Sequence, residues 1–220
     1  MIERQPRGSR LILVRHGETE GESSIRYHGR TDVPLSELGR AQTRFAGRAI
    51  EKHRGGVNFV HVFSSPLVRA SEGARIVAGG TAPPAVGRSA VPTMVTIDEF
   101  AEVHFGLFEG LTADEIRDRH PEEFARWNAD RLAPTYTYPE GESRADFTNR
   151  VERGLERMLS IWTPREDDAL LVAHRGVIRA IVRKLTRHEP VVELGSIHIL
   201  LFDGGWQVEM LDLIDHLGDS

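Results

Sequence analysis

Two short basic motifs, each with one histidine, directly follow apolar stretches of the chain. The motif at 15–17 reads Arg-His-Gly and follows residues 11–14, and the motif at 174–176 reads His-Arg-Gly and follows residues 169–173. A neutral imidazole nitrogen is a competent nucleophile, and nearby guanidinium groups favour the neutral form because they lower the imidazole pKa. The pattern therefore indicates a histidine nucleophile that works beside positive charge.

Further charged residues follow two other predicted strands. Arg69 comes one helical turn after the Ser-Ser-Pro stretch at 64–66, and Glu102 follows residues 94–97. Arginine side chains bind phosphate oxygens bidentately and neutralise transition-state charge, while a carboxyl group donates a proton to a leaving oxygen and later activates water. This combination favours phosphoryl transfer, and it needs no metal if the arginines supply the positive charge.

Apolar stretches that alternate with amphipathic ones predict the elements that position these residues. Strands are expected at 11–14, 59–63, 94–97 and 169–173, with a terminal hairpin at 197–202 and 206–211. Helix N-caps are expected at Ser36, at Thr112 (with Glu115 completing a capping box) and at Ser143. The alternation predicts an α/β fold with helices on both faces of the sheet, in which ligands bind beyond the carboxyl ends of the strands.

The composition narrows the class of protein. The chain has 220 residues, 40% of them hydrophobic, and 28 basic against 33 acidic residues give a net charge of −5. An acidic balance argues against binding across a broad face of nucleic acid or an anionic membrane. Cysteine is absent, which excludes disulfides and thiolate chemistry. No apolar run reaches the roughly 18–20 residues of a membrane span, and the polar N-terminus lacks a signal-peptide pattern, so a cytoplasmic location is expected.

Six ordered sequence blocks resemble the histidine phosphatase superfamily, the phosphoglycerate mutase-like clan. They are LVRHGETE at 13–20, GRTDVPLSELGRAQ at 29–42, SSPLVRA at 64–70, Glu102 with the FG and EG pairs at 105–106 and 109–110, GES at 141–143 and VAH at 172–174. The likeness covers about residues 10–210. We expect 1–9 to be a flexible N-terminal tail and 10–220 to be a single histidine phosphatase-like domain with a lid insertion at about 107–139.

The resemblance implies a fold and a role for each matching residue. The implied fold is a three-layer α/β/α sandwich with a mostly parallel central sheet. His16 would be the nucleophile that forms a phosphohistidine, and Glu102 the proton donor and acceptor. Arg15, Arg69 and His174 would hold the phosphoryl group. Further candidates for contacts with the substrate are Thr19, Arg26, Gly29, Arg175 and Gly176. The implied enzyme is a metal-independent phosphatase without a cofactor.

Several positions depart from the family pattern. Glu22 stands where asparagine is common, His28 where glutamine is common, and Gly73 where threonine is common. Glu22 would bring a carboxylate near an anion site. Arg175 replaces a frequent glycine, and we expect its side chain to point away so that only its backbone N–H is used; the alternative is that it adds positive charge.

The resemblance leaves the reaction open between hydrolysis and transfer. In phosphoglycerate mutases an arginine follows the acidic glutamate, whereas Val103 follows Glu102 here, and the stretch at 131–138 has no arginine pair. A second anionic group on the substrate would then find few partners, so a phosphomonoester hydrolase similar to α-ribazole and broad-specificity phosphatases is favoured. Phosphoglycerate mutase-type transfer and a non-catalytic phospho-ligand binding protein are the alternatives, and a homodimer also stays open.

The aromatic residues of the lid have a plainer interpretation. Trp127, Tyr136 and Tyr138 are expected to pack the lid rather than to form a specific aromatic cage. The histidines other than His16 and His174 are expected to be surface or packing residues.

Overall fold

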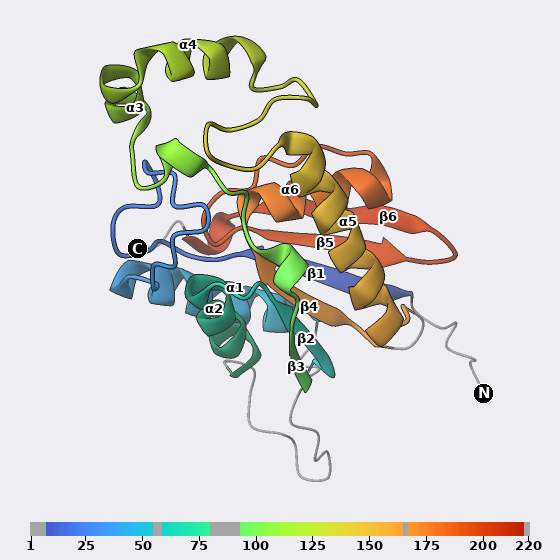
Figure 1. Ribbon diagram of the computed structural model, residues 1–220. Coiled ribbons are helices and arrows are strands. Elements are labelled where there is room, and N and C mark those ends of the chain that lie inside the picture. Colours follow the sequence, from blue (N-terminus) through green and yellow to red (C-terminus); the bar gives the residue numbers. More distant parts are fainter. Residues whose placement is uncertain (1–7, 55–58, 80–92, 165–166, 218–220) are drawn as a thin grey trace, which may run out of the picture.

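The computed structural model describes residues 8–54, 59–79, 93–164 and 167–217. Most of the predicted tail, residues 1–7, lies outside these ranges. The first strand begins at Ser9, within the segment expected to be tail. The chain forms one six-stranded sheet with helices on both faces (Figure 1), as the alternating sequence pattern predicts.

The sheet has the strand order β3-β2-β4-β1-β5-β6. Four of its strands are parallel, whereas β5 runs antiparallel to β1 and pairs with β6 as the predicted hairpin. The strands are β1 (Ser9–Arg15), β2 (His61–Ser64), β3 (Thr93–Thr96), β4 (Ala169–Ala173), β5 (Ile197–Phe202) and β6 (Trp206–Leu213). The carboxyl ends of β1 to β4 therefore meet at one edge, where the predicted site residues follow them.

Two helix pairs cover the sheet. The helices α1 (Glu37–Arg54) and α2 (Val68–Gly79) lie on one face, and α5 (Arg144–Ile161) and α6 (Arg175–Thr186) lie on the other (Figure 1). Successive β1 residues alternate between the two cores, with Leu11 and Leu13 packing in one and Ile12 and Val14 in the other. Because both faces of the strand are buried, it reads as a continuous apolar run. This is a three-layer α/β/α sandwich, as expected.

The predicted helix starts are confirmed. The Ser36 hydroxyl accepts the Gly39 N–H at 3.1 Å. Thr112 and Glu115 form the reciprocal capping box before α3 (Ala113–Arg119), and the Ser143 hydroxyl accepts the Asp146 N–H at 2.9 Å before α5. These local bonds satisfy N–H groups that a helix leaves unpaired at its start.

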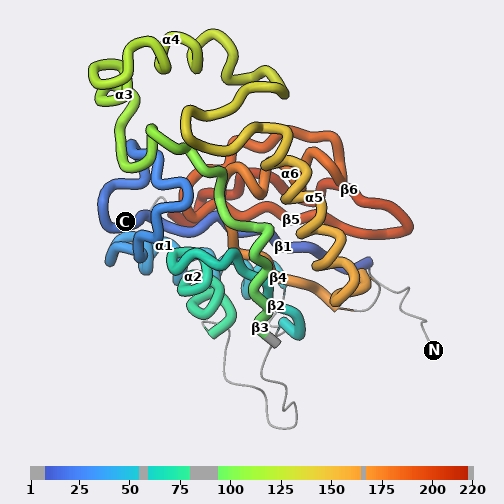
Figure 2. Tube along the Cα trace, in the orientation of Figure 1, coloured from blue at the N-terminus to red at the C-terminus, as the bar shows by residue number. Residues whose placement is uncertain are grey.

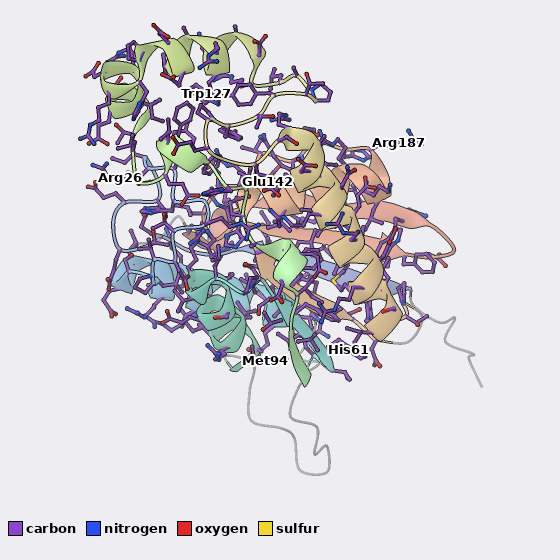
Figure 3. All side chains as sticks on the ribbon, viewed as in Figure 1. Arg26, His61, Met94, Trp127, Glu142 and Arg187 are labelled. Carbon is purple, nitrogen blue, oxygen red and sulfur yellow. The ribbon has the colours of Figure 1, made fainter. Side chains whose placement is uncertain are left out.

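The segment predicted as a lid projects beyond the three layers. It contains a 3-10 helix (Gly106–Phe108), α3 and α4 (Pro121–Asp130), and its green-to-yellow trace rises above the edge of the sheet (Figure 2). Trp127 points from α4 toward the rest of the molecule (Figure 3), where its ring meets that of Tyr27 at 5.9 Å. Trp127, Tyr136 and Tyr138 are all buried and pack within the lid. Within the described residues, no helix has the length and apolar character needed to cross a membrane.

Candidate active site

Three polar side chains stand at equivalent places on three neighbouring strands. Ser65, His174 and His16 are the residues that directly follow β2, β4 and β1, which are adjacent in the sheet. His174 Nε2 and the Ser65 hydroxyl are 2.7 Å apart, and the rings of His16 and His174 have centroids 5.1 Å apart. The parallel register therefore brings together two histidines that are 158 positions apart in the sequence.

His16 is held in one defined protonation state. Its Nδ1 lies 2.7 Å from the Gly17 carbonyl oxygen, which only accepts, so Nδ1 carries the proton and Nε2 keeps its lone pair. Burial and the positive charges of Arg69 and Arg15 hold the pKa of His16 well below 6.5. The imidazole is therefore neutral and nucleophilic at neutral pH. A side chain at Gly17 would bring its Cβ within 2.3 Å of the Gly39 carbonyl oxygen, so glycine allows α1 to approach this turn.

Two arginines beside the histidines are fixed by backbone carbonyls. Arg69 is 2% exposed and donates its terminal nitrogens to the carbonyls of Thr31 and Gly29, at 2.9 and 2.7 Å. Arg15 donates Nη1 to the Val192 carbonyl at 3.1 Å, and its buried Nε has no partner among the described residues. Burial, together with repulsion from Arg175, lowers the pKa of Arg15 to about 10, which leaves it charged at neutral pH. The pair forms a preorganised positive site.

The carbonyl that holds Arg15 belongs to a strained residue. Val192 is fully buried with φ 62°, a left-handed conformation that is unusual for a β-branched side chain. Asp212 accepts the N–H groups of Val191 and Val192, the shortest of these contacts being 2.9 Å. The same Val192 carbonyl also accepts Arg175 Nε at 3.2 Å. Asp212 therefore fixes an oxygen that anchors two guanidinium groups.

Glu102 is positioned by its carboxylate and by its backbone. One carboxylate oxygen accepts the N–H of the next residue, Val103, at 3.0 Å, and the other accepts the Gly176 N–H at 3.1 Å. The Glu102 carbonyl accepts Arg30 Nε at 3.0 Å, and Arg150 Nη1 donates to the Ala101 carbonyl at 2.9 Å. A Cβ at residue 176 would lie 2.5 Å from Glu102 Oε1, so glycine there allows the close approach.

These groups converge on one cavity of about 260 Å³, which we call the histidine cavity. Its lining includes all five residues that the sequence predicts to be catalytic: Arg15, His16, Arg69, Glu102 and His174. Buried guanidinium groups beside a neutral imidazole suit an oxyanion-sized ligand. The carboxyl group on the rim suits proton exchange with a leaving oxygen.

Three of the other predicted contacts are placed differently. Thr19 is 2% exposed and does not line the histidine cavity, because its N–H bonds to Glu18 and Ser23 hold it in the adjoining turn. The Gly176 N–H is already bound to Glu102. Arg26 does line the cavity, but Glu115 and the Gly110 carbonyl take its Nη1.

Gly29, another predicted contact, lines the cavity, and its carbonyl accepts Arg69 Nη2. Two of the residues that depart from the family pattern, Arg175 and His28, line the cavity as well. Arg175 lines the cavity with its side chain, which contradicts the expectation that it points away: the Val192 carbonyl draws its Nε inward. Glu22 is not among the lining residues and lies 3.5 Å from Arg26. His28 lines the cavity, and burial lowers its pKa.

Sequence reasoning missed several supporting residues. Ser65 could have been found, because it follows β2 as His16 follows β1. Arg150, Val192 and Asp212 carry no local signal, since their partners lie far away in the sequence. In the part of the chain that the structure describes, no three His, Asp or Glu side chains gather closely enough to bind a metal ion.

Comparisons with known proteins identify the family. The family model for the histidine phosphatase superfamily (branch 1) matches residues 11–210. An acid phosphatase of Mycobacterium tuberculosis is 31% identical over 178 residues, which cover 81% of this chain and 76% of that protein. A 2,3-bisphosphoglycerate-dependent phosphoglycerate mutase 2 of Gloeobacter violaceus is 31% identical over 181 residues, 82% of this chain and 77% of that protein.

Other relatives differ in length or resemble the chain mainly in fold. The bifunctional protein Rv2228c of Mycobacterium tuberculosis is 35% identical over 175 residues, or 80% of this chain, and this chain spans only 43% of its length. The crystal structure of the alpha-ribazole phosphatase from Shigella flexneri matches with a TM-score of 0.74 and 24% identity over 93% of this chain and 96% of that one. At that identity the match supports the fold alone.

Proposed function

The chain belongs to the histidine phosphatase superfamily (branch 1), and we propose that it hydrolyses small phosphomonoesters through a phosphohistidine on His16. The observation that carries the proposal is the free Nε2 of a neutral His16 in a cavity that Arg15 and Arg69 make positive. Acyl or glycosyl transfer would not require so many fixed cations, whereas a phosphoryl group spreads negative charge over three oxygens.

The proposed reaction has two steps. His16 Nε2 attacks phosphorus and forms a P–N bond as the bond to the leaving oxygen breaks, and Glu102 gives its proton to that oxygen. Glu102 then takes a proton from water, whose oxygen attacks phosphorus and breaks the P–N bond. Phosphate leaves and the His16 lone pair is restored. Arg15, Arg69 and His174 hold the phosphoryl oxygens throughout.

Trapping the intermediate tests this proposal. The protein is mixed with ³²P-labelled 4-nitrophenyl phosphate and quenched without acid, because phosphohistidine is acid-labile. We expect label on the peptide that contains His16, and His16→Ala should lose the label together with at least about 10³-fold in kcat. The control His188→Ala removes an exposed histidine that does not line the histidine cavity and should keep both. Full turnover without a labelled His16 would overturn the assignment.

The fate of the label separates the alternatives. Hydrolysis releases all of it as inorganic phosphate, even with excess 3-phosphoglycerate present. Label appearing on that acceptor would instead identify a mutase. A phosphate analogue that binds without any labelling or turnover would identify a non-catalytic binding protein. The valine after Glu102 favours hydrolysis.

A further inference from the structure

A second cavity of about 470 Å³ adjoins the histidine cavity. The two share four lining residues: Tyr27, Glu102, Phe105 and Arg175. Glu102, the proposed proton donor to the leaving oxygen, therefore stands on their common border. A phosphomonoester with its phosphoryl group at His16 would extend its alcohol portion past Glu102 into this second space.

One wall of the second cavity is basic. Arg175, Arg179 and Arg183 line it from one side of α6, four residues apart, and Arg131 and Arg144 line it from other segments. Like charges at this spacing destabilise a helix. A cation at Arg183 suits the last turn of α6, but Arg175 is the first residue of that helix, where the helix dipole disfavours positive charge. The helix dipole therefore does not explain the row.

The arginines keep donors available. Arg179 uses Nε for the Pro190 carbonyl at 2.9 Å, and its terminal nitrogens have no hydrogen-bond or ion-pair partner among the described residues. Arg183 Nη1 forms an ion pair with Glu189 at 3.9 Å, and Glu189 also lines the cavity. The terminal nitrogens of Arg179, which face no fixed acceptor among the described residues, are suited to a carboxylate or phosphate that arrives with the ligand.

Another part of the lining is aromatic. It is made of Tyr27, Phe105, Trp127, Tyr138 and Phe147. The rings of Tyr27, Phe105 and Tyr138 pack edge to face, with centroids 5.2 Å apart for Tyr27 and Phe105 and 5.0 Å for Phe105 and Tyr138. Such a wall suits an apolar, planar group. The sequence expectation that a second anionic group would find few partners considered only the stretch at 131–138, whereas three of the arginines that line this cavity come from α6.

We propose that the second cavity, which we call the arginine–aromatic cavity, binds the leaving group; this inference rests on the proposed function. The substrate class is then a phosphomonoester with an apolar planar body and a second anionic group. The body would lie on the aromatic wall and the second anion against Arg179 and Arg183. At about 1.5 Å per residue, these positions lie about 6 and 12 Å along α6 from Arg175. The substrate is therefore extended.

A matched pair of substrates tests this. The probes are 4′-carboxybiphenyl-4-yl phosphate and its neutral carboxamide, which differ only in the distal charge. We expect kcat/KM to be about tenfold higher for the acid than for the amide, through KM, because each charged hydrogen bond contributes roughly that factor. Equal values for the two probes would overturn the proposal.

Variants of Arg179 test whether this residue binds the second anionic group. Arg179→Gln should lower kcat/KM for the acid about tenfold and leave the amide unchanged, and Arg179→Lys should restore part of the difference. The control Arg153→Gln removes an exposed arginine of α5 that does not line the cavity, and it should change neither probe. Equal losses for acid and amide in Arg179→Gln would indicate a structural role and overturn the proposal.

Binding separates this inference from the catalytic one. The phosphonate analogues of both probes bind without turnover, so calorimetry measures their affinities directly. A preference for the acid phosphonate in a protein without turnover would reject the proposed hydrolysis and support the subsite. Turnover of both phosphates, together with equal affinities for the two phosphonates, would support the proposed hydrolysis and reject the subsite.

Discussion

The histidine cavity and the arginine–aromatic cavity both use arginine, but they hold it differently. Arg69 is 2% exposed and its two terminal nitrogens are bound to backbone carbonyls, so its position is fixed before any ligand arrives. In the second cavity Arg183 is exposed, and Arg131 lies over the Trp127 ring at 5.1 Å. Fixed charge suits a phosphoryl group of constant shape, since no reorganisation is needed during reaction. Exposed charge whose terminal nitrogens are not bound to carbonyls can adjust to the anion of a larger leaving group.

The largest effect is expected at Glu102, which lies on the border between the two cavities. Glu102→Gln removes the proton donor, so kcat for an alkyl phosphate should fall about 10²- to 10⁴-fold. The loss should be much smaller for 4-nitrophenyl phosphate, whose leaving group needs little protonation. Steady-state kinetics with both substrates measures the contrast. Glu99→Gln, whose carboxylate pairs with Arg157 at 3.3 Å, is the control and should keep activity. Similar losses for both substrates would contradict the donor role.

A smaller effect is expected from the support of the histidine cavity. Asp212→Ala frees the N–H groups of Val191 and Val192, so the carbonyl that positions Arg15 loses its anchor. We expect kcat/KM to fall about tenfold for acid and amide probes alike, because the phosphoryl site itself is misplaced. Asp212→Asn keeps one acceptor and should recover part of the loss. Asp215→Ala is a nearby control that leaves these bonds intact. A loss confined to the acid probe would contradict this prediction, because it would show that Asp212 supports the second cavity and not the phosphoryl site.

The smallest predicted change concerns pH. Burial and two arginines hold the His16 pKa well below 6.5, so the ring stays neutral as the pH falls through 6.5, and nucleophilicity is lost only further down. Histidine NMR should find the His16 ring still neutral at pH 6. The preference for the acid over the amide probe does not depend on His16, so it should stay constant over the same range. A His16 ring that protonates at 6.5 would contradict the cavity's electrostatics.

The sequence is enough to predict the features that depend on local residue patterns or on the order of the strands. Helix caps depend on residues three positions apart, and the ends of parallel strands share an edge, so the meeting of His16 and His174 could be expected. Partners far away in the sequence could not be foreseen. The Gly176 N–H is bound to Glu102, 74 positions away, and Arg26 is bound to Glu115, 89 positions away. The arginine row on α6 is visible in the sequence as a spacing of four, but only the folded structure brings aromatic residues of the lid into the same cavity.

The short stretch around Val192 joins the two cavities. The Val192 carbonyl anchors both Arg15 and Arg175, and the Pro190 carbonyl anchors Arg179. A mutation that moves the whole stretch, Pro190 included, alters turnover and substrate choice together, whereas Asp212→Ala frees only the N–H groups of Val191 and Val192. Sequence change at residues 190–192 is therefore constrained, whereas substitutions at Arg183 and in the lid can change selectivity without disturbing the reacting centre.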